Sequence, residues 1–285
     1  MVSTRTPAGH LKTALMAGVT LVAGGVLFAA AVYGQGVTRT TDGHPDLSGL
    51  YVGGANLPSG GDTQNYASRG GNFFGFEEDN GLVRQSDRNR PVYKPEYWEQ
   101  IKSNDYNGNW IDPVHKCLPA GVPGLGMPAQ VVNVAGQPAV ILLYRGGFTG
   151  YGQRYVNWPE VRWVWTDGRP HDPAQLVQES YNGDAIGHWE GDTLVIETIG
   201  FTDNTWLTRT GFIHGFQMKV TERMSRDGDT LKWEATVEDP EYFQEPWVLL
   251  PASAKINPKP GAVLGATPPC QDFDAGLLSS PTQSQ

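Results

Sequence analysis

An acidic residue on an apolar strand face is the clearest indication of chemistry in this sequence. Glu222 lies in the run 217–224, where it alternates in phase with Met218, Val220 and Met224. A strand places every second side chain on one face, so these neighbours direct Glu222 into the interior. Burial raises the pKa of a carboxyl group, and such a group is a competent general acid or base near neutral pH. The alternative is a structural carboxylate that pairs with an arginine or a tyrosine hydroxyl.

Two histidines stand at the ends of predicted strands, where a side chain can lean over the mouth of a β-barrel. His171 follows the turn 166–170, and His214 lies in the short connection that leads into the strand of Glu222. An imidazole titrates near neutral pH and can pass a proton in either direction. We therefore predict His214, His171 and Glu222 as the catalytic residues of an acid–base reaction that needs no cofactor.

Five further side chains are predicted to bind a small molecule. They supply hydroxyl, guanidinium, carboxylate and indole groups from the same strands and loops: Tyr181, Arg162, Asp203, Trp206 and Arg223. Asp203 could orient the ring of His214, although an Asx-turn explains the same residue. Arg162 could equally pair with an acidic side chain.

Several classes of site have no support in the sequence. No two histidines have the spacing of a local metal-binding pair, and there is no nucleophile elbow, P-loop or dinucleotide-binding motif. We therefore expect no metal and no other cofactor. The formal net charge is −9 at pH 7, without a basic cluster, so we expect no nucleic-acid partner. A small-molecule ligand or substrate is the expected partner. The sequence also allows a homodimer.

Two similar hairpins indicate how these residues are positioned. The run 181–201 reads YNGDAIGHWEGDTLVIETIGF, and its tetrapeptide Gly-Asp-Thr-Leu returns at 228–231. Each copy joins two alternating runs through a Gly-containing polar turn, which is typical of β-hairpins. Successive hairpins predict an all-β fold: an antiparallel up-and-down barrel of the calycin/lipocalin type, or a sandwich. Long N-terminal loops and one short helix over 95–102 would accompany it.

Composition divides the chain into four segments. Residues 1–34 have the basic start, apolar run and small residues of a signal peptide, although the run could also serve as an uncleaved anchor. Residues 35–130 are predicted to be loop-rich and to pack on a barrel formed by 131–250, and residues 251–285 form a partly disordered tail. We expect a periplasmic or secreted protein that leaves the membrane after cleavage. Cys117 and Cys270 could form one disulfide there, or remain as two thiols.

The aromatic content bears on function. Nine tryptophans, eleven tyrosines and ten phenylalanines exceed what the core of one barrel needs. Such side chains can line a cavity for an aromatic or apolar molecule, or they can pack the loops onto the sheet. The sequence favours an exported lyase, with a hydrolase second. A non-catalytic, lipocalin-like binding protein is the alternative.

Three motifs resemble those of a large family of exported, mostly uncharacterised bacterial proteins. They are HPDLSG at 44–49, DGRPH at 167–171 and the hairpin at 181–201, which fits the pattern IGxWEGDTLVxxTxGF. The resemblance covers roughly residues 43–250 and implies export and a β fold. The chain departs from the residues expected in this family at His188, where arginine is expected, and at Thr208, where an acid is expected. The second departure argues against a catalytic role for that loop.

Overall fold

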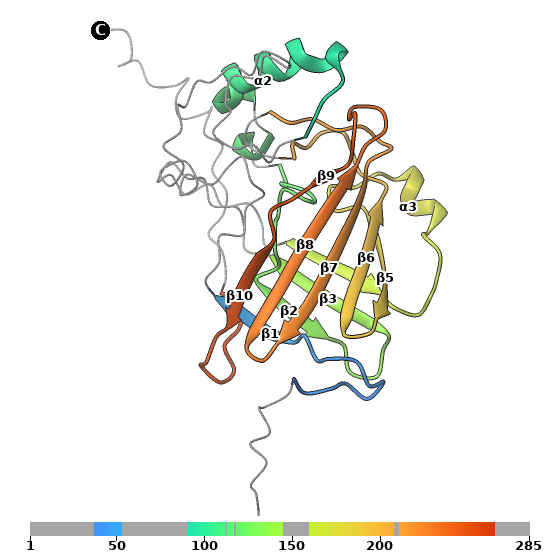
Figure 1. Cartoon of the computed structure of the whole chain (residues 1–285), viewed down its shortest axis with the longest axis vertical. Coiled ribbons are helices and arrows are strands. Elements are labelled where there is room, and N and C mark those ends of the chain that lie inside the picture. The colour runs from blue at the N-terminus through green and yellow to red at the C-terminus, as the bar shows by residue number, and fades with distance from the viewer. Residues whose placement is uncertain are drawn as a thin grey trace, which may run out of the picture. The chain divides into compact units, whose positions relative to one another are not determined.

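The chain folds into a closed β-barrel, as the sequence predicts. The computed structural model describes residues 37–52, 91–111, 113–116, 118–144, 160–207 and 211–265. Within them, ten strands follow the order β10-β1-β2-β3-β4-β5-β6-β7-β8-β9, and an additional pairing of β10 with β8 closes the barrel (Figure 1). β9 is an extra strand that pairs with β8. All pairings are antiparallel except that of β4 with β5.

The longest strands, of seven to nine residues, are β5 to β8. In chain order, the strands are β1 (Gly49–Val52), β2 (Gln130–Asn133), β3 (Ala139–Tyr144), β4 (Glu160–Trp165), β5 (Asp184–Glu190), β6 (Thr193–Ile199), β7 (Lys219–Asp227), β8 (Thr230–Glu238), β9 (Trp247–Val248) and β10 (Ala252–Ile256). The junction of β4 and β5 is the weakest in the barrel wall, because it consists of a single parallel pair, Trp165 with Ile186.

The two predicted hairpins form the most regular part of the wall. β5 turns into β6 after Glu190 pairs with Thr193, and β7 turns into β8 in the same way. Gly191 and Gly228 occupy equivalent turn positions with φ of 60° and 58°. These left-handed values strain a residue with a side chain, so the turns require glycine or a residue such as asparagine that tolerates them.

Alternation along the strands fills the barrel interior with side chains. The fully buried ones include Leu142, Val164, Leu194, Ile196, Val220, Met224, Leu231 and Val237. Met218, Val220 and Met224 are buried together with Glu222, so the inward face of β7 is the predicted one. Each such aliphatic side chain contributes about 1.5–3 kcal/mol through its removal from water.

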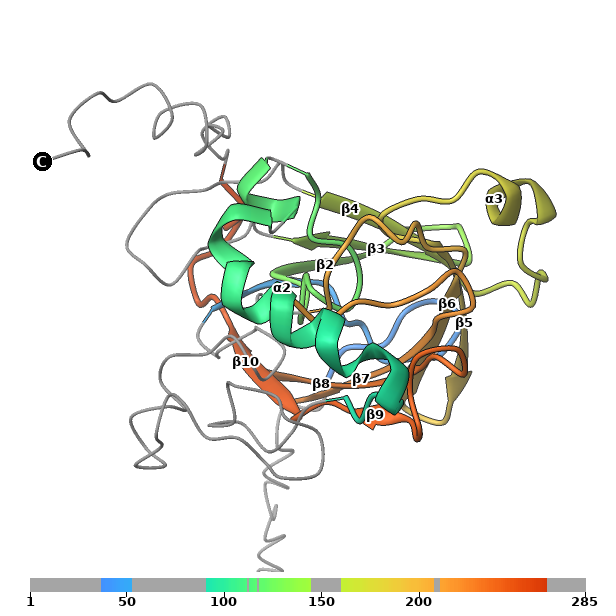
Figure 2. The same ribbon diagram turned by 90° about the horizontal axis from the view of Figure 1, so that it is seen from above.

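A helix lies across one end of the barrel. The helix predicted over 95–102 begins as the 3-10 turn η1 (Pro95–Tyr97) and continues as α2 (Trp98–Ile111), followed by the 3-10 turn η2 (Pro113–Lys116). Figure 2, which looks onto this end, shows α2 crossing the barrel. Ile101 anchors the helix in the core with no exposed surface. A further short helix, α3 (Pro173–Val177), stands outside the wall between β4 and β5.

The HPDLSG motif packs against the barrel from the N-terminal side. Leu47 is fully buried, and its backbone N–H donates to Asn133. Arg226 donates to the carbonyl oxygen of Asp46, and the ring of His44 stacks on Trp189 with centroids 4.6 Å apart. The motif is therefore explained by packing and backbone hydrogen bonds.

The barrel draws strands from outside the predicted range of 131–250. β1 comes from the predicted loop segment 35–130, and β10 comes from the predicted tail. Both cysteines of the predicted disulfide, Cys117 and Cys270, lie outside the described residues. None of the described helices has the length and apolar character needed to cross a bilayer.

Candidate functional site

Two of the predicted site residues meet inside the barrel. Nη2 of Arg162 on β4 lies 2.7 Å from Oε2 of Glu222 on β7, and the side chains are 2% and 1% exposed. Arg162 also donates to the hydroxyl of Tyr144 at 2.7 Å and to Thr198 at 2.8 Å. The indole N–H of Trp233 donates to Oε1 of Glu222 at 3.0 Å. This arrangement supports the structural alternative, in which an arginine balances the buried carboxylate.

The electrostatics of this cluster keep Arg162 charged. Burial acts to lower the pKa of Arg162, but Glu222 and Tyr144 outweigh it and hold that pKa above its ordinary value. Burial also raises the pKa of Tyr144, so its hydroxyl stays protonated. The two charges match, although Nε of Arg162 and Oε2 of Glu222 are buried without a hydrogen-bond partner among the described residues, so the cluster resembles a packed ionic core.

A second buried carboxyl lies on the same strand face, and the sequence analysis missed it. Glu160 begins β4 and is only 7% exposed, with the backbone N–H of Ala120 donating to its Oε1 at 3.2 Å. Burial raises the pKa of Glu160 above its ordinary value. Its signal was the period-two spacing to Arg162 and Val164, which the sequence analysis did not use.

His214 is buried at the end of the barrel covered by α2. Its Nδ1 lies 3.2 Å from the carbonyl oxygen of Gly215, and its Nε2 lies 2.7 Å from the hydroxyl of Thr205. The pattern assigns the proton to Nδ1 and makes Nε2 the acceptor of the Thr205 hydroxyl. Burial lowers the pKa of His214, so the ring is neutral at pH 7.

The remaining predicted ligand-binding residues do not converge. Tyr181 and Trp206 are half-buried, and Asp203, in the same loop as Trp206, is exposed. Arg223 lies on the outer face of β7 and pairs with Glu190 at 2.7 Å. Among the described residues, no hydrogen bond joins these side chains to one another or to His214, and Arg223 lies outside the barrel.

His171 lies on the outer surface of the barrel, within a row of alternating charges. Its Nδ1 is 2.8 Å from Oδ2 of Asp184, and its Nε2 is 3.3 Å from Oε1 of Glu197. Oε2 of Glu197 lies 3.9 Å from the amine of Lys219, which binds Glu238 at 2.6 Å. The row crosses β5, β6, β7 and β8, so this histidine is held by two carboxylates from neighbouring strands.

A groove of about 650 Å³ lies beside this row, and we call it the β4–β5 groove. It follows the outer face of β4 to the single-pair junction with β5. The side chains that give it its chemistry are Val161, Trp163, Trp165, Arg169, Gln175 and Asp184. Asp184, which lines this groove, is therefore also the carboxylate that binds His171.

The floor of the groove is an exposed aromatic stack. Trp163 and Trp165 project from the same face of β4, with ring centroids 5.7 Å apart and an interplanar angle of 21°. The guanidinium of Arg169 lies 3.9 Å from the centroid of Trp165 and binds Asp167 at 2.6 Å. Trp163 remains 46% exposed. A large indole left half in water within a hollow is a typical ligand platform.

Asp184 lines the groove, and one of its two carboxylate oxygens is left without a donor among the described residues. Both of its hydrogen bonds use Oδ2, which accepts from His171 at 2.8 Å and from the backbone N–H of Asp172 at 3.0 Å. No hydrogen-bond donor in the described part of the chain reaches Oδ1. Sequence reasoning placed Asp184 in the hairpin and missed its role, because its partner His171 joins it only through the fold.

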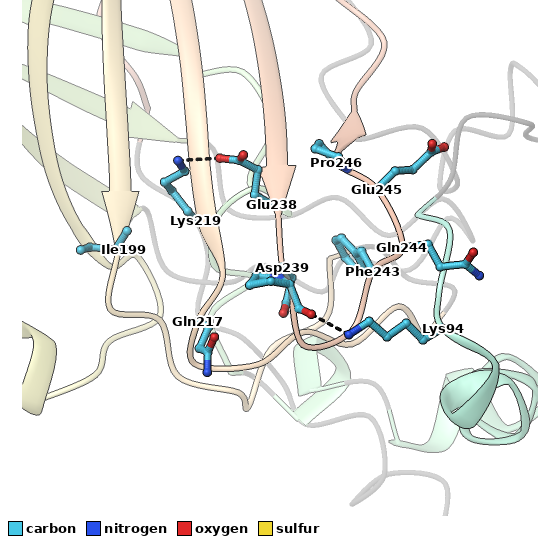
Figure 3. Close-up of a pocket in the computed structure, with 11 residues that line it drawn as sticks. Lys94, Ile199, Gln217, Lys219, Glu238, Asp239, Phe243, Gln244, Glu245 and Pro246 are labelled. Atoms are coloured by element: carbon cyan, nitrogen blue, oxygen red, sulfur yellow. Dashed lines mark hydrogen bonds and ion pairs between the residues drawn. The ribbon is translucent and has the colours of Figure 1, made fainter.

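A second hollow of about 680 Å³ lies near the ends of β7 and β8 (Figure 3). Four of its five charged side chains are engaged within the protein, and the fifth, Glu245, is exposed. Lys219 binds Glu238, and Lys94 donates to the carbonyl oxygen of Pro240 at 2.7 Å. Asp239 accepts from three backbone N–H groups, one of them Gly215 at 2.7 Å. This hollow therefore offers mainly apolar surface.

Comparison with known proteins adds no function. No protein-family model, no curated protein and no solved structure matches the chain. Among the described residues, no three histidine, cysteine or acidic side chains are grouped so that they could hold a metal ion.

Proposed function

We propose that the chain is an exported protein that binds a small, ring-bearing molecule in the β4–β5 groove. The observation that carries this proposal is Trp163, which stays 46% exposed although it stacks on Trp165. Leaving an indole in water forgoes stabilisation of about 25 cal/mol per Å² of apolar surface. A ring that covers Trp163 recovers that free energy on binding.

A second candidate function is acid–base catalysis in the same groove, most plausibly a lyase reaction and secondarily hydrolysis. The observation that favours it is the pair of Asp184 and His171. Oδ1 of Asp184 is free to take a proton from a bound molecule, while Nδ1 of His171 holds Oδ2 at 2.8 Å. Loss of a neighbouring leaving group would complete an elimination. His171 then acts as a positioning residue behind the carboxylate.

The proposed site lies on the outer face of the barrel, whereas two of the catalytic residues predicted from the sequence lie in the interior. His214 and Glu222 are each 1% exposed and bonded within the protein. A group of this kind needs structural opening before a substrate reaches it. Asp184 and Trp163 need none, because both line the groove.

Saturation-transfer NMR with a panel of aromatic and carbohydrate compounds tests the binding function on purified residues 35–285. We expect the binding signal to vanish in Trp163→Ala. Phe216→Ala is the matched control, because Phe216 is 52% exposed and lies outside the groove. Ligand binding that persists in Trp163→Ala would show that the site lies elsewhere.

A further inference from the structure

The β4–β5 groove offers a ligand one aromatic face. Arg169 covers Trp165, so Trp163 is the more exposed indole of the stack. A pocket that holds an apolar molecule by burial alone usually encloses 70–90% or more of its surface. An open groove with one platform cannot do this. A ligand must therefore gain free energy from hydrogen bonds at its edges as well as from stacking.

The rim of the groove supplies those hydrogen bonds. Oδ1 of Asp184 is an acceptor without a donor among the described residues, and the exposed amides of Gln137 and Gln175 also line the groove. A carboxylate accepts from hydroxyl groups, and an amide both donates and accepts. Hydroxyl groups around a ring have the same dual capacity. The rim thus matches a polyhydroxylated ring.

The charges of the groove disfavour an anionic ligand. Arg169 is neutralised by Asp167, and hydrogen bonds from Arg169 lower the pKa of that carboxyl to about 2. Arg162 reaches the groove lining, but its charge is balanced by Glu222 in the interior. Asp184 and the neighbouring Asp172 then leave the groove net negative. A carboxylate or phosphate ligand would meet repulsion here.

We infer that the ligand of the β4–β5 groove is a neutral carbohydrate. One C–H face of a pyranose ring stacks on Trp163, and its ring hydroxyls donate to Oδ1 of Asp184 and exchange hydrogen bonds with Gln175. This inference deepens the proposed function and rests on it. It names a substrate class that differs from the aromatic molecule predicted from the sequence.

The probes are methyl β-glucopyranoside, methyl α-mannopyranoside, cellobiose, phenol and benzoate, each titrated by saturation-transfer NMR. We expect at least one neutral sugar to bind and benzoate not to bind. Trp163→Ala and Asp184→Asn should each weaken sugar binding by at least tenfold. Phe216→Ala and Asp227→Asn are exposed controls outside the groove and should leave sugar binding unchanged. Circular dichroism verifies that each variant is folded.

Each other outcome has a distinct meaning. Binding of phenol or benzoate, but of no sugar, that is lost in Trp163→Ala would overturn the carbohydrate inference and leave the proposed site intact. Sugar binding that both groove variants retain would overturn the inference and the site together. Binding of none of the five probes would overturn the carbohydrate inference, and the wider panel would then decide on the proposed function.

Discussion

Arg162 and Glu222 form an ion pair inside the barrel, with Nη2 and Oε2 2.7 Å apart. The pair links β4 to β7, and Tyr144, Thr198 and Trp233 bond to its two partners. Neither charge could be buried alone, because desolvation of a lone ion costs several kcal/mol. The pair therefore selects the arrangement in which both inward strand faces meet.

Removal of one partner should destabilise the protein far more than removal of both. We expect Glu222→Leu to lower the free energy of unfolding by about 3–5 kcal/mol, since it leaves Arg162 charged and buried. The double variant Arg162→Met/Glu222→Leu should recover most of that loss. Urea unfolding measures the free energy of unfolding of the unchanged protein, of Glu222→Leu and of the double variant. Arg223→Met is the matched control, because Arg223 pairs with Glu190 on the exposed side of the same strand and should change little.

A double variant that is as unstable as Glu222→Leu would contradict this account. It would mean that the hydrogen bonds to Tyr144 and Trp233, rather than the balance of charge, determine the stability of the cluster.

Burial of His214 should make the protein less stable in mild acid. The folded state lowers the pKa of this ring, whereas the unfolded chain has a histidine pKa of about 6.5. Below that value the unfolded state binds more protons, so the free energy of unfolding falls as the pH falls. The decline ends once the pH passes below the lowered pKa of the folded state.

Urea midpoints between pH 5 and 8 measure this effect. His214→Gln should flatten the slope below pH 6.5, even if the variant is less stable throughout. His188→Gln is the control, because the His188 side chain is 62% exposed. An unchanged slope in His214→Gln would show that another group is responsible.

The turn at Gly191 should accept asparagine and resist valine. Its φ is 60°, and nothing lies within 4 Å of an added Cβ, so backbone conformation alone decides the outcome. A β-branched residue in the left-handed region costs about 1–2 kcal/mol, while asparagine tolerates it better. Thermal unfolding should rank Gly191 above Gly191→Asn, and Gly191→Asn above Gly191→Val. Equal stability of the two variants would argue against this φ.

Exported chain should lack residues 1–34. The basic start and apolar run of this segment predict removal by a signal peptidase. Intact-mass spectrometry of the protein recovered from a periplasmic or culture fraction measures the N-terminus directly. A mass that includes the first 34 residues would support the uncleaved anchor instead.

The barrel was predictable from sequence where the strands alternate strongly. β7 and β8 carry clean two-residue patterns, and their turn glycines mark both hairpins. β1 and β10 were less predictable, because GLYV and ASAKI are short and the apolar face of ASAKI consists mainly of alanine. Their pairing partners lie far away in the chain, and β10 pairs with both β1 and β8.

The candidate site was less predictable, because its residues meet only in the fold. The run EVRWVW in β4 places Val161, Trp163 and Trp165 on one face and Glu160, Arg162 and Val164 on the other, so hydrophobic alternation alone would direct the tryptophans inward. The structure turns Arg162 to the interior and the tryptophans to the groove. His171 was predicted because an imidazole ring can transfer protons. Its contact with Asp184, however, depends on the pairing of β4 with β5.

Catalysis, if the groove carries it, should depend on Asp184 and not on the buried histidine. Mass spectrometry of panel compounds incubated with the protein detects conversion. We expect Asp184→Asn to lower kcat by about 10²–10⁴-fold, as removal of a general base does. His171→Gln should lower kcat less and shift the pH profile, because it acts through the carboxylate it holds at 2.8 Å. Thr205→Val weakens the hydrogen bonding of His214 and should leave the pH profile unchanged.

Two outcomes would contradict catalysis by Asp184. Turnover that survives Asp184→Asn but disappears in folded His214→Ala would show that the reaction takes place in the barrel interior. No conversion of any bound compound would favour the non-catalytic binding function.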